Sequence, residues 1–359
     1  MSTGIQWTDE VWNPVIGCTP VSPGCLNCYA ATMANRMRAM PQAKDYHDRV
    51  TTVGYNGVPC GFRTVRIAEV KNGRAVFTGD VRCLEHKLGE PLSWKKPRRV
   101  FVNSMSDLFH ESVPFEFIDR VFAVMALCPR HTFQVLTKRP ERMAEYLLAT
   151  GGKVNGKSLD REGHVGLAAM GITFEAQDAG LKHVGKGVQL HRDGELVKWP
   201  LPNVWLGTSC ENQATADLRI PHLLACPAAV RFLSCEPLLG PIDLTRFLDL
   251  DPLRIGVPNA FVNRPDWVIV GGESGPNARM CDIEWVREIV KQCAGSGVPC
   301  FVKQLGAAPY SSVSCHPSMV HAAPNSRGWP LLDPKGGDPS EWPEDVRVRQ
   351  MPVGAGVTA

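Results

Sequence analysis

The sequence predicts an α/β protein, a full or partial TIM-like (β/α) barrel of parallel strands with insertions. Seven short runs rich in Val, Ile, Phe and Leu recur along the chain, and segments with helical spacing follow several of them. Such runs are typical of parallel strands that are buried on both faces, and their alternation with helices indicates repeated βα units. A doubly wound open sheet is the alternative arrangement of the same units.

The expected strands lie at residues 12–17, 99–104, 131–139, 203–212, 230–237, 266–274 and 298–306. The first and third strands lead into two helices, expected at residues 29–38 and 140–149. The helix after the second strand has an apolar stripe that should cover the sheet, formed by Ile118, Val121, Phe122 and Met125.

Two helices have recognisable ends in the sequence. Ser112 can cap the helix after the second strand, with Pro114 in its first turn. Asp282 at one end and the glycines Gly295 and Gly297 at the other bracket the helix before the last strand.

The same pattern predicts the domain organisation. We expect one barrel domain over residues 1–306 and an irregular C-terminal extension over residues 307–359. Three stretches richer in Gly, Pro and charge, at about 41–98, 150–202 and 243–265, are expected as insertions. In the second, Asp193-Gly194 lies between alternating runs and predicts a hairpin.

Composition narrows the class of protein. The chain is 44% hydrophobic and 21% charged, which excludes an intrinsically disordered protein. Its net charge of +3 excludes a strong electrostatic field over the whole surface. The first ten residues carry no leader, and no segment reaches the roughly 18 apolar residues of a membrane span. We therefore expect a cytoplasmic protein with no membrane partner, whose 13 cysteines are reduced.

Three cysteines cluster in the loop after the first expected strand. The segment GCTPVSPGCLNCYA places Cys18, Cys25 and Cys28 as Cys-x6-Cys-x2-Cys. Three thiolates on a 4Fe-4S cluster leave one iron open, and S-adenosylmethionine (SAM) occupies that position in radical SAM enzymes. Their commonest signature, Cys-x3-Cys-x2-Cys, has a shorter first gap, but the position after the first barrel strand agrees.

Zinc is the alternative metal for this loop. Structural zinc takes four protein ligands, so Cys60, Cys83 or His47 would complete the set. The protein would then be a zinc-stabilised nucleic-acid-binding module rather than an enzyme.

Polar residues at the carboxyl ends of the strands predict a ligand site, since β/α barrels bind ligands there. SAM carries a carboxylate and an ammonium group, which call for cationic and anionic partners. The candidate cofactor-binding residues are Ser104, Asp107, Lys138, Arg139, Ser209, Glu211, Glu273 and Lys303. The candidate catalytic residues are Cys210, Cys235 and Glu236. Glu236 could also supply a charge to SAM, and the two cysteines have an alternative role as buried small side chains.

Several segments together resemble a phage and prophage family of three-cysteine, radical-SAM-like proteins. They are WTDEVWNPVIGC, the cysteine loop, NSMSDLFH, QVLTKRPERM, GTSCEN, LSCEPLLGPI, VGGESG and FVKQLG. Some members look like the phage isomerases that act on glycyl-modified thymidine during DNA hypermodification. The resemblance implies a DNA or modified-nucleotide substrate and an external electron donor, and a repair or processing enzyme is the alternative.

A DNA substrate would need phosphate contacts near the site and a base that leaves the stack. The densest positive run, KKPRR, supplies Lys95, Lys96, Arg98 and Arg99. This run precedes the second expected strand, so it should lie opposite the catalytic end of the barrel.

Overall fold

The computed structural model describes residues 5–38, 40, 44–53, 59–149, 153–154, 157–158, 161, 164–166, 168–170, 172, 199–248, 264–313, 329 and 331–352. The chain forms two compact units, Met1–Val204 and Trp205–Ala359. The division falls within β12, one of the expected strands.

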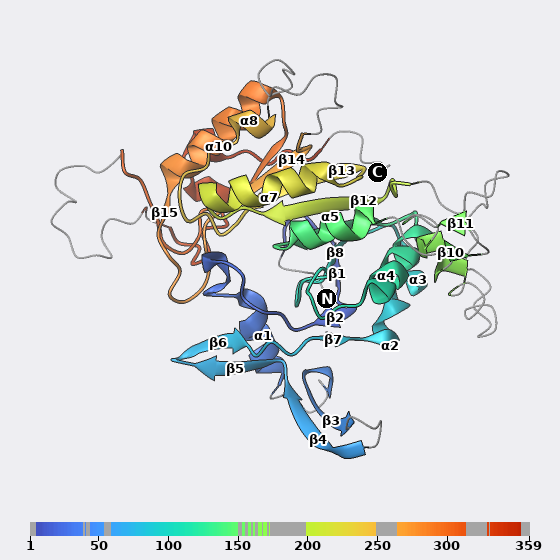
Figure 1. The fold of residues 1–359 in the computed structure, drawn as a ribbon. Coiled ribbons are helices and arrows are strands. Elements are labelled where there is room, and N and C mark those ends of the chain that lie inside the picture. Colours follow the sequence, from blue (N-terminus) through green and yellow to red (C-terminus); the bar gives the residue numbers. More distant parts are fainter. Residues whose placement is uncertain are drawn as a thin grey trace. The chain divides into compact units, whose positions relative to one another are not determined.

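The first unit is built on three parallel strands, β1 (Glu10–Trp12), β8 (Arg99–Val102) and β9 (Thr132–Thr137) (Figure 1). Trp12 pairs with Val102, and Val102 pairs with Val135. Helix α4 (Phe115–Leu127) connects β8 to β9, and α5 (Pro140–Leu148) follows β9. The expected second and third strands and their helices are thus confirmed.

Helix α4 confirms its expected apolar stripe and corrects its expected start. All four stripe residues are buried, but the N-cap is Pro114 rather than Ser112. The backbone N–H of Ser112 instead donates to Nδ1 of His110, at 3.1 Å. Arg142 binds the carbonyl groups of His110 and Val113, both at 2.8 Å, and so fixes this segment in a loop.

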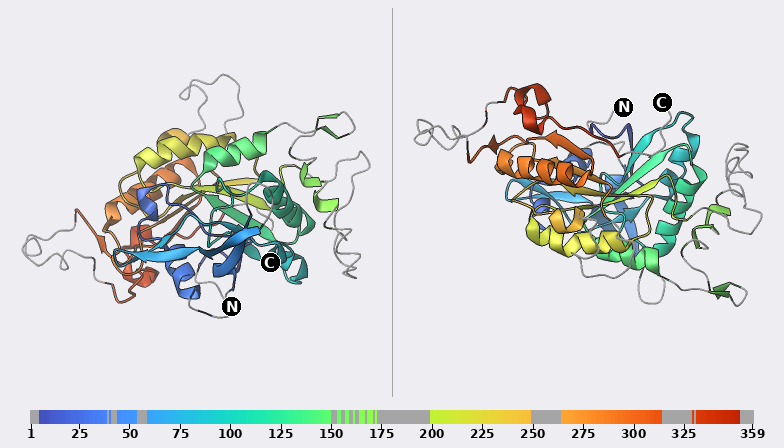
Figure 2. Two further views of the ribbon diagram at one scale, coloured as in Figure 1. Left: turned by 60° about the horizontal axis from the view of Figure 1, so that its bottom comes forward. Right: turned by 90° about the horizontal axis from the view of Figure 1, so that it is seen from above.

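The second unit contains four parallel strands, β12 (Val204–Ser209), β13 (Val230–Cys235), β14 (Trp267–Gly271) and β16 (Cys300–Gln304). Helix α7 (Gln213–Ala225) packs against β13, and α10 (Ile283–Ser296) packs against β14 and β16 (Figure 2). Asp282 caps α10 by accepting the N–H of Glu284, as expected. Gly297 ends this helix with φ of 67°, whereas Gly295, expected outside, lies within it.

Strand order separates the two arrangements that the sequence left open. Within each unit, the parallel strands lie side by side in chain order, β1-β8-β9 in the first and β12-β13-β14-β16 in the second, and neither run reverses direction. A doubly wound sheet reverses at its switch point, whereas a β/α barrel does not. The described strands therefore have the order of part of a β/α barrel.

The first expected strand is divided at Asn13-Pro14. β1 ends at Trp12, and β2 (Val15–Ile16) pairs antiparallel with β7 (Arg82–Cys83). Proline has no N–H to donate to a ladder, so the strand cannot continue through this dipeptide. The cysteine loop consequently begins after β2.

The insertion expected at about 41–98 forms hairpins and a small core. β3 (His47–Val53) pairs with β4 (Pro59–Arg66), and β5 (Ala68–Lys71) pairs with β6 (Arg74–Phe77). Helix α1 (Tyr29–Met37) packs against β5 and β6, burying Ala30, Ala34, Ile67 and Phe77 together. The same insertion contains η2 (Lys44–Tyr46), α2 (Glu85–Leu88) and α3 (Glu90–Ser93).

The remaining elements are short. β10 (Lys153–Val154) and β11 (Lys157–Ser158) form a hairpin, and the hairpin expected at Asp193-Gly194 lies outside the described residues. In the second unit, β15 (Cys281–Asp282) pairs with β17 (Pro309–Tyr310). That unit also contains α8 (Thr245–Leu248), η5 (Pro339–Glu341) and η6 (Glu344–Val346). Within the described part of the chain, no helix is long and apolar enough to cross a membrane.

Candidate functional site

The cysteine loop runs from β2 to α1 in the first unit. Gly17 precedes it with φ of 89°, and a Cβ there would lie 2.0 Å from the carbonyl oxygen of Asp80. Cys25 ends the 3-10 turn η1 (Pro23–Cys25), and Cys28 is the N-cap of α1. Cys18, Cys25 and Cys28 are all half-buried free thiols. Glycine is required where the chain turns into the loop, since a side chain would be strained and would clash.

The surroundings of the thiols are electrostatically mixed. Burial and, second, the charge of Asp107 raise the pKa of Cys18 to about 12, although Arg139 opposes this through its charge and a hydrogen bond. Burial also raises the pKa of Cys28, while the backbone N–H groups of Ala31 and Ala30 lower it. The charge of Cys28 acts on Cys18, and that of Cys25 acts on Cys28, so the three thiols are electrostatic neighbours.

No group of three or more His, Cys, Asp or Glu residues in a metal-ion arrangement occurs in the described part of the chain. Ligands of a single ion converge on one centre about 2.3 Å from each sulfur. The thiolates of a 4Fe-4S cluster instead bind separate irons. The arrangement that is absent among the described residues is therefore a preformed site for a single ion.

Asp107 organises the loop that follows β8. Asp107 is buried, and its carboxylate accepts hydrogen bonds from Thr137 Oγ1 at 2.7 Å and from the backbone N–H groups of Phe109 and Lys138, each at 3.0 Å. It therefore ties the loop after β8 to the end of β9.

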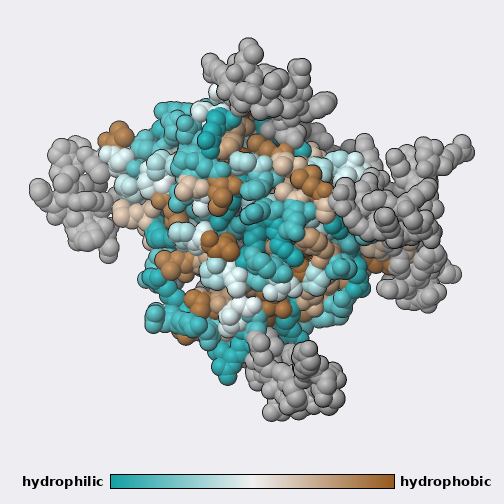
Figure 3. Space-filling view, viewed as in Figure 1, coloured by the Kyte–Doolittle hydropathy of each residue, from teal (hydrophilic) through white to brown (hydrophobic). Residues whose placement is uncertain are grey.

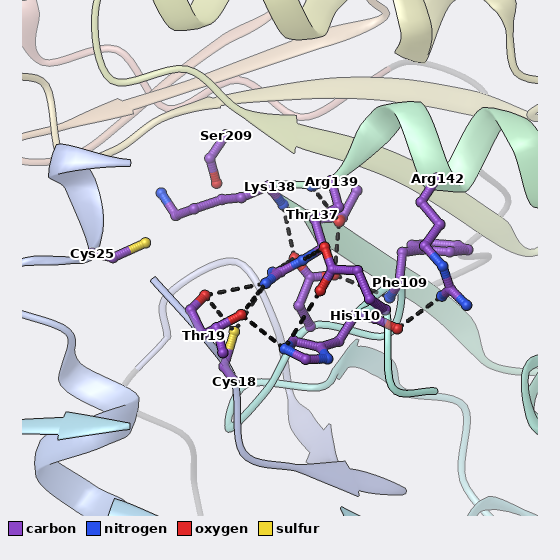
Figure 4. A network of polar contacts seen from close by, with 12 residues as sticks. Cys18, Thr19, Cys25, Phe109, His110, Thr137, Lys138, Arg139, Arg142 and Ser209 are labelled. Atoms are coloured by element: carbon purple, nitrogen blue, oxygen red, sulfur yellow. Dashed lines mark hydrogen bonds and ion pairs between the residues drawn. The ribbon is translucent and has the colours of Figure 1, made fainter. Parts of the chain in front are cut away.

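Arg139 connects Asp107 to the cysteine loop, and Figure 4 shows it bonded to Thr19 of that loop. Its Nε donates to Glu111 Oε1 at 2.8 Å, and Nη1 donates to Asp107 Oδ2 at 3.3 Å and to Cys18 Sγ at 3.7 Å. Its Nη2 donates to the carbonyl oxygen of Thr19 at 3.1 Å and to Thr19 Oγ1 at 2.7 Å. One buried cation thus binds both the loop after β8 and the cysteine loop.

His110 adds a neutral contact to the same network. Its Nδ1 accepts the N–H of Ser112, so the proton of the neutral ring is on Nε2, which lies 2.9 Å from Thr19 Oγ1. Burial lowers the pKa of His110, and the charge of Arg139 lowers it further. The ring is therefore neutral at pH 7 and donates to Thr19.

Two further predicted cofactor residues lie at the strand ends of this unit. Ser104 donates from Oγ to Asn13 Oδ1 at 3.2 Å. The side chain of Lys138 extends toward the cysteine loop, and its charge lowers the pKa of Cys28 (Figure 4). Nδ2 of Asn103, directly after β8, is buried without a hydrogen-bond partner among the described residues.

In the second unit, the predicted carboxylates lie at strand ends, and each forms an ion pair. Glu211 pairs with Arg219 at 2.9 Å, Glu236 with Lys303 at 3.1 Å, and Glu273 with Arg279 at 2.6 Å. Ser209 ends β12, and its carbonyl oxygen accepts from Arg219. The assignment of Ser209, Glu211, Glu273 and Lys303 to SAM remains a prediction.

Cys210 and Cys235 are both completely buried. Burial raises the pKa of Cys235 well above its usual value, and the nearby Cys210 and Cys293 raise it further. This environment is that of small buried side chains, and the catalytic assignment of both cysteines stays untested.

The first unit thus brings together Cys18, Asp107, Lys138 and Arg139, which the sequence predicted separately. The sequence prediction missed Thr19 and Glu111, which contact Arg139, and also His110, which contacts Thr19, and Arg142, which binds the loop after β8. Thr19 adjoins Cys18, and His110 and Glu111 follow the second strand, so the strand-end rule extended by a few residues would have included them. Nothing in the sequence singles out Arg142, or Arg219 in α7.

The basic run carries less uncompensated charge than its sequence suggests. Arg98 forms an ion pair with Glu10 at 2.5 Å, and Arg99 forms one with Asp9 at 2.9 Å. Both precede or begin β8, so the run lies at the amino ends of the strands, as expected.

The surface around the cysteines includes exposed apolar side chains. Val21, Leu26 and Tyr29 are 44%, 48% and 66% exposed. On the face seen in Figure 3, apolar residues form separate patches among hydrophilic ones.

Comparisons with known proteins identify a family but no function. The sequence matches the family described as "Protein of unknown function (DUF5131)" over residues 2–331. Comparison with curated proteins and with solved structures finds no match. Because the family match covers most of the chain, the protein belongs to the DUF5131 family.

Proposed function

We propose that this protein is a radical SAM enzyme in which Cys18, Cys25 and Cys28 hold a 4Fe-4S cluster. The observation that carries the proposal is the cysteine loop itself: three neighbouring free thiols follow the first strands of a β/α sheet and lie beside two cations, Lys138 and Arg139. Its expected fold is a full or partial β/α barrel.

The donor set suits such a cluster chemically. The ligand thiols must be deprotonated; burial raises the pKa of Cys18 and Cys28, and the cations and the amide groups at the start of α1 partly offset this by favouring the thiolate form. When bound, the cluster and SAM would supply reductive cleavage of SAM to a 5′-deoxyadenosyl radical. An external electron donor would provide the electron.

Binding of SAM is assigned to the strand ends. In the first unit, the orphaned amide of Asn103 supports a ligand there, because buried donors are normally paired. Lys138 is a candidate for the SAM carboxylate. The second unit has its own candidates for an ammonium group, Glu236 and Glu273, and binding there would compete with their present partners Lys303 and Arg279.

For the substrate, we propose a nucleobase of phage DNA, with isomerisation of a glycyl-modified thymidine as the reaction. The support is the resemblance of the sequence motifs to the phage family. Lys95 and Lys96 are the candidates for phosphate contacts in the basic run, since Arg98 and Arg99 are already in ion pairs.

Anaerobic reconstitution with iron and sulfide, followed by reduction and electron paramagnetic resonance, tests the cofactor. We expect a four-iron signal that SAM perturbs, and its loss in Cys18→Ala but not in the matched variant Cys83→Ala, which alters another half-buried cysteine of this unit. A colourless protein that retains one zinc per chain would replace the proposal with the zinc module.

Variants of the second unit test the binding of SAM. Glu236→Gln and Glu273→Gln should weaken SAM binding, measured by calorimetry, while the iron content stays at the wild-type level. Unchanged SAM affinity in both would remove these carboxylates from the site.

A further inference from the structure

Arg139 has a hydrogen-bonding pattern that differs from that of a ligand-binding arginine. A guanidinium group has five N–H donors. Five contacts to Glu111, Asp107, Cys18 and Thr19 use them all within the protein. Binding the SAM carboxylate through two parallel bonds would require two of these contacts to break.

Three of the five contacts go to the cysteine loop. Two hold the backbone and side chain of Thr19, directly after Cys18, and the third reaches the sulfur of Cys18. Only 6% of the Arg139 side chain is exposed, so its charge is poorly screened by solvent. The geometry therefore fixes a positive charge and an N–H donor at one ligand sulfur.

We propose that Arg139 is a positioning residue that holds the Cys18 ligand in place and raises the reduction potential of the cluster. The inference rests on the proposed function. Reduction adds one negative charge to the cluster, and a nearby cation or a hydrogen bond to a ligand sulfur stabilises that charge. Arg139 thus contacts the ligand loop and leaves SAM to other side chains.

Glu111 is a negative charge that contacts the guanidinium of Arg139. Its carboxylate contacts Nε of Arg139, and 63% of its side chain is exposed. Replacing it with glutamine removes a negative charge without disturbing buried packing. The reduction potential of the cluster should then become more positive, whereas loss of the Arg139 charge should make it more negative. The change should be the smaller of the two because solvent screens an exposed charge.

The test is a redox titration of the reconstituted wild type and of Arg139→Gln, followed by electron paramagnetic resonance, with iron content measured in parallel. Losing a hydrogen bond to a charged group should make one-electron reduction about tenfold less favourable, a shift of about 59 mV to more negative potential. Arg130→Gln is the matched control: this guanidinium binds the carbonyl groups of Trp94, Pro91 and Leu92 at the amino ends of the strands, away from the cysteine loop, and the variant should keep the wild-type potential.

The outcomes separate this inference from the proposed function. A wild type that takes up no cluster sinks the proposed function. A wild-type potential in a folded Arg139→Gln, with the cluster present, overturns only the role of Arg139. If Arg139→Gln does not fold, Glu111→Gln decides: a more positive potential supports the inference, and an unchanged one overturns it.

Discussion

The two ends of the strands in the first unit use the same kinds of side chain in different environments. At the amino ends, Asp9 accepts from the backbone N–H and the guanidinium of Arg99, and 46% of the Asp9 side chain is exposed. At the carboxyl ends, Asp107 makes equivalent bonds to Lys138 and Arg139, but only 7% of its side chain is exposed.

The difference in burial assigns the two ends different roles. An exposed ion pair contributes little because water competes for both charges. A buried one is costly to break, and here it also binds the cysteine loop through Arg139. The carboxyl ends therefore hold a buried polar network that includes the cysteine loop, whereas the amino ends carry ordinary surface charge.

The largest effect is expected from Asp107→Asn. An amide NH₂ would face donors that now bind a carboxylate, and Arg139 would lose its buried counter-charge. We expect a loss of about 3–5 kcal/mol in the free energy of unfolding, measured by urea denaturation. The matched Asp9→Asn should cost less than about 1 kcal/mol. Equal losses would refute the distinction between the two ends.

Gly17→Ala tests the turn into the cysteine loop. Alanine would combine a positive φ with a clash against the carbonyl oxygen of Asp80, so we expect a loss of about 2–4 kcal/mol in thermal or urea melts. Gly73 has φ of 75°, but a Cβ at this position would meet nothing within 4 Å, so Gly73→Ala should cost only about 1 kcal/mol. Similar costs would mean that the loop can move away from Asp80.

His131, just before β9, should make the free energy of unfolding depend on pH. It packs against Trp94 and Phe133, and burial lowers its pKa to about 4, with the charge of Arg130 as a second cause. Between pH 6.5 and 4 the unfolded chain binds a proton that the folded protein does not, so stability should fall as the pH falls, by up to about 3 kcal/mol. This contribution is fully present above pH 6.5.

The variant His131→Phe should remove that part of the pH dependence. Urea denaturation at several pH values would measure it, with wild type as the reference. A slope that persists in the variant would assign the dependence to other groups.

The smallest effect concerns DNA binding at the amino ends. If Lys95 and Lys96 contact phosphates, the double glutamine variant should reduce the salt dependence of DNA affinity by about 0.9 per lost contact. Arg98→Gln should change it less, because this guanidinium is paired with Glu10. Fluorescence anisotropy with a labelled duplex at several salt concentrations would measure both, and an unchanged slope in the double variant would exclude the lysines.

Much of the fold was predictable because it depends on local pattern. All seven expected runs contain strands, since buried parallel strands need continuous apolar residues wherever they lie. The errors were also local: Ser112 was expected to cap α4, but its N–H is held by His110, and Gly295 was expected outside α10, where Gly297 provides the left-handed turn. The neighbouring His110 decided the first position, and the backbone conformation of Gly297 decided the second.

The sequence by itself determined the apolar runs, the cysteine spacing and the polar residues after each strand, because these are properties of neighbouring residues. Only the tertiary structure decided which polar groups meet: Arg139 and Cys18 are 121 positions apart, and Asp107 and Thr137 are 30 apart. Pairing of β1, β8 and β9 brings their carboxyl ends to one edge. Burial at that edge then keeps solvent from screening the charge of Arg139. Burial is a property of the folded chain alone.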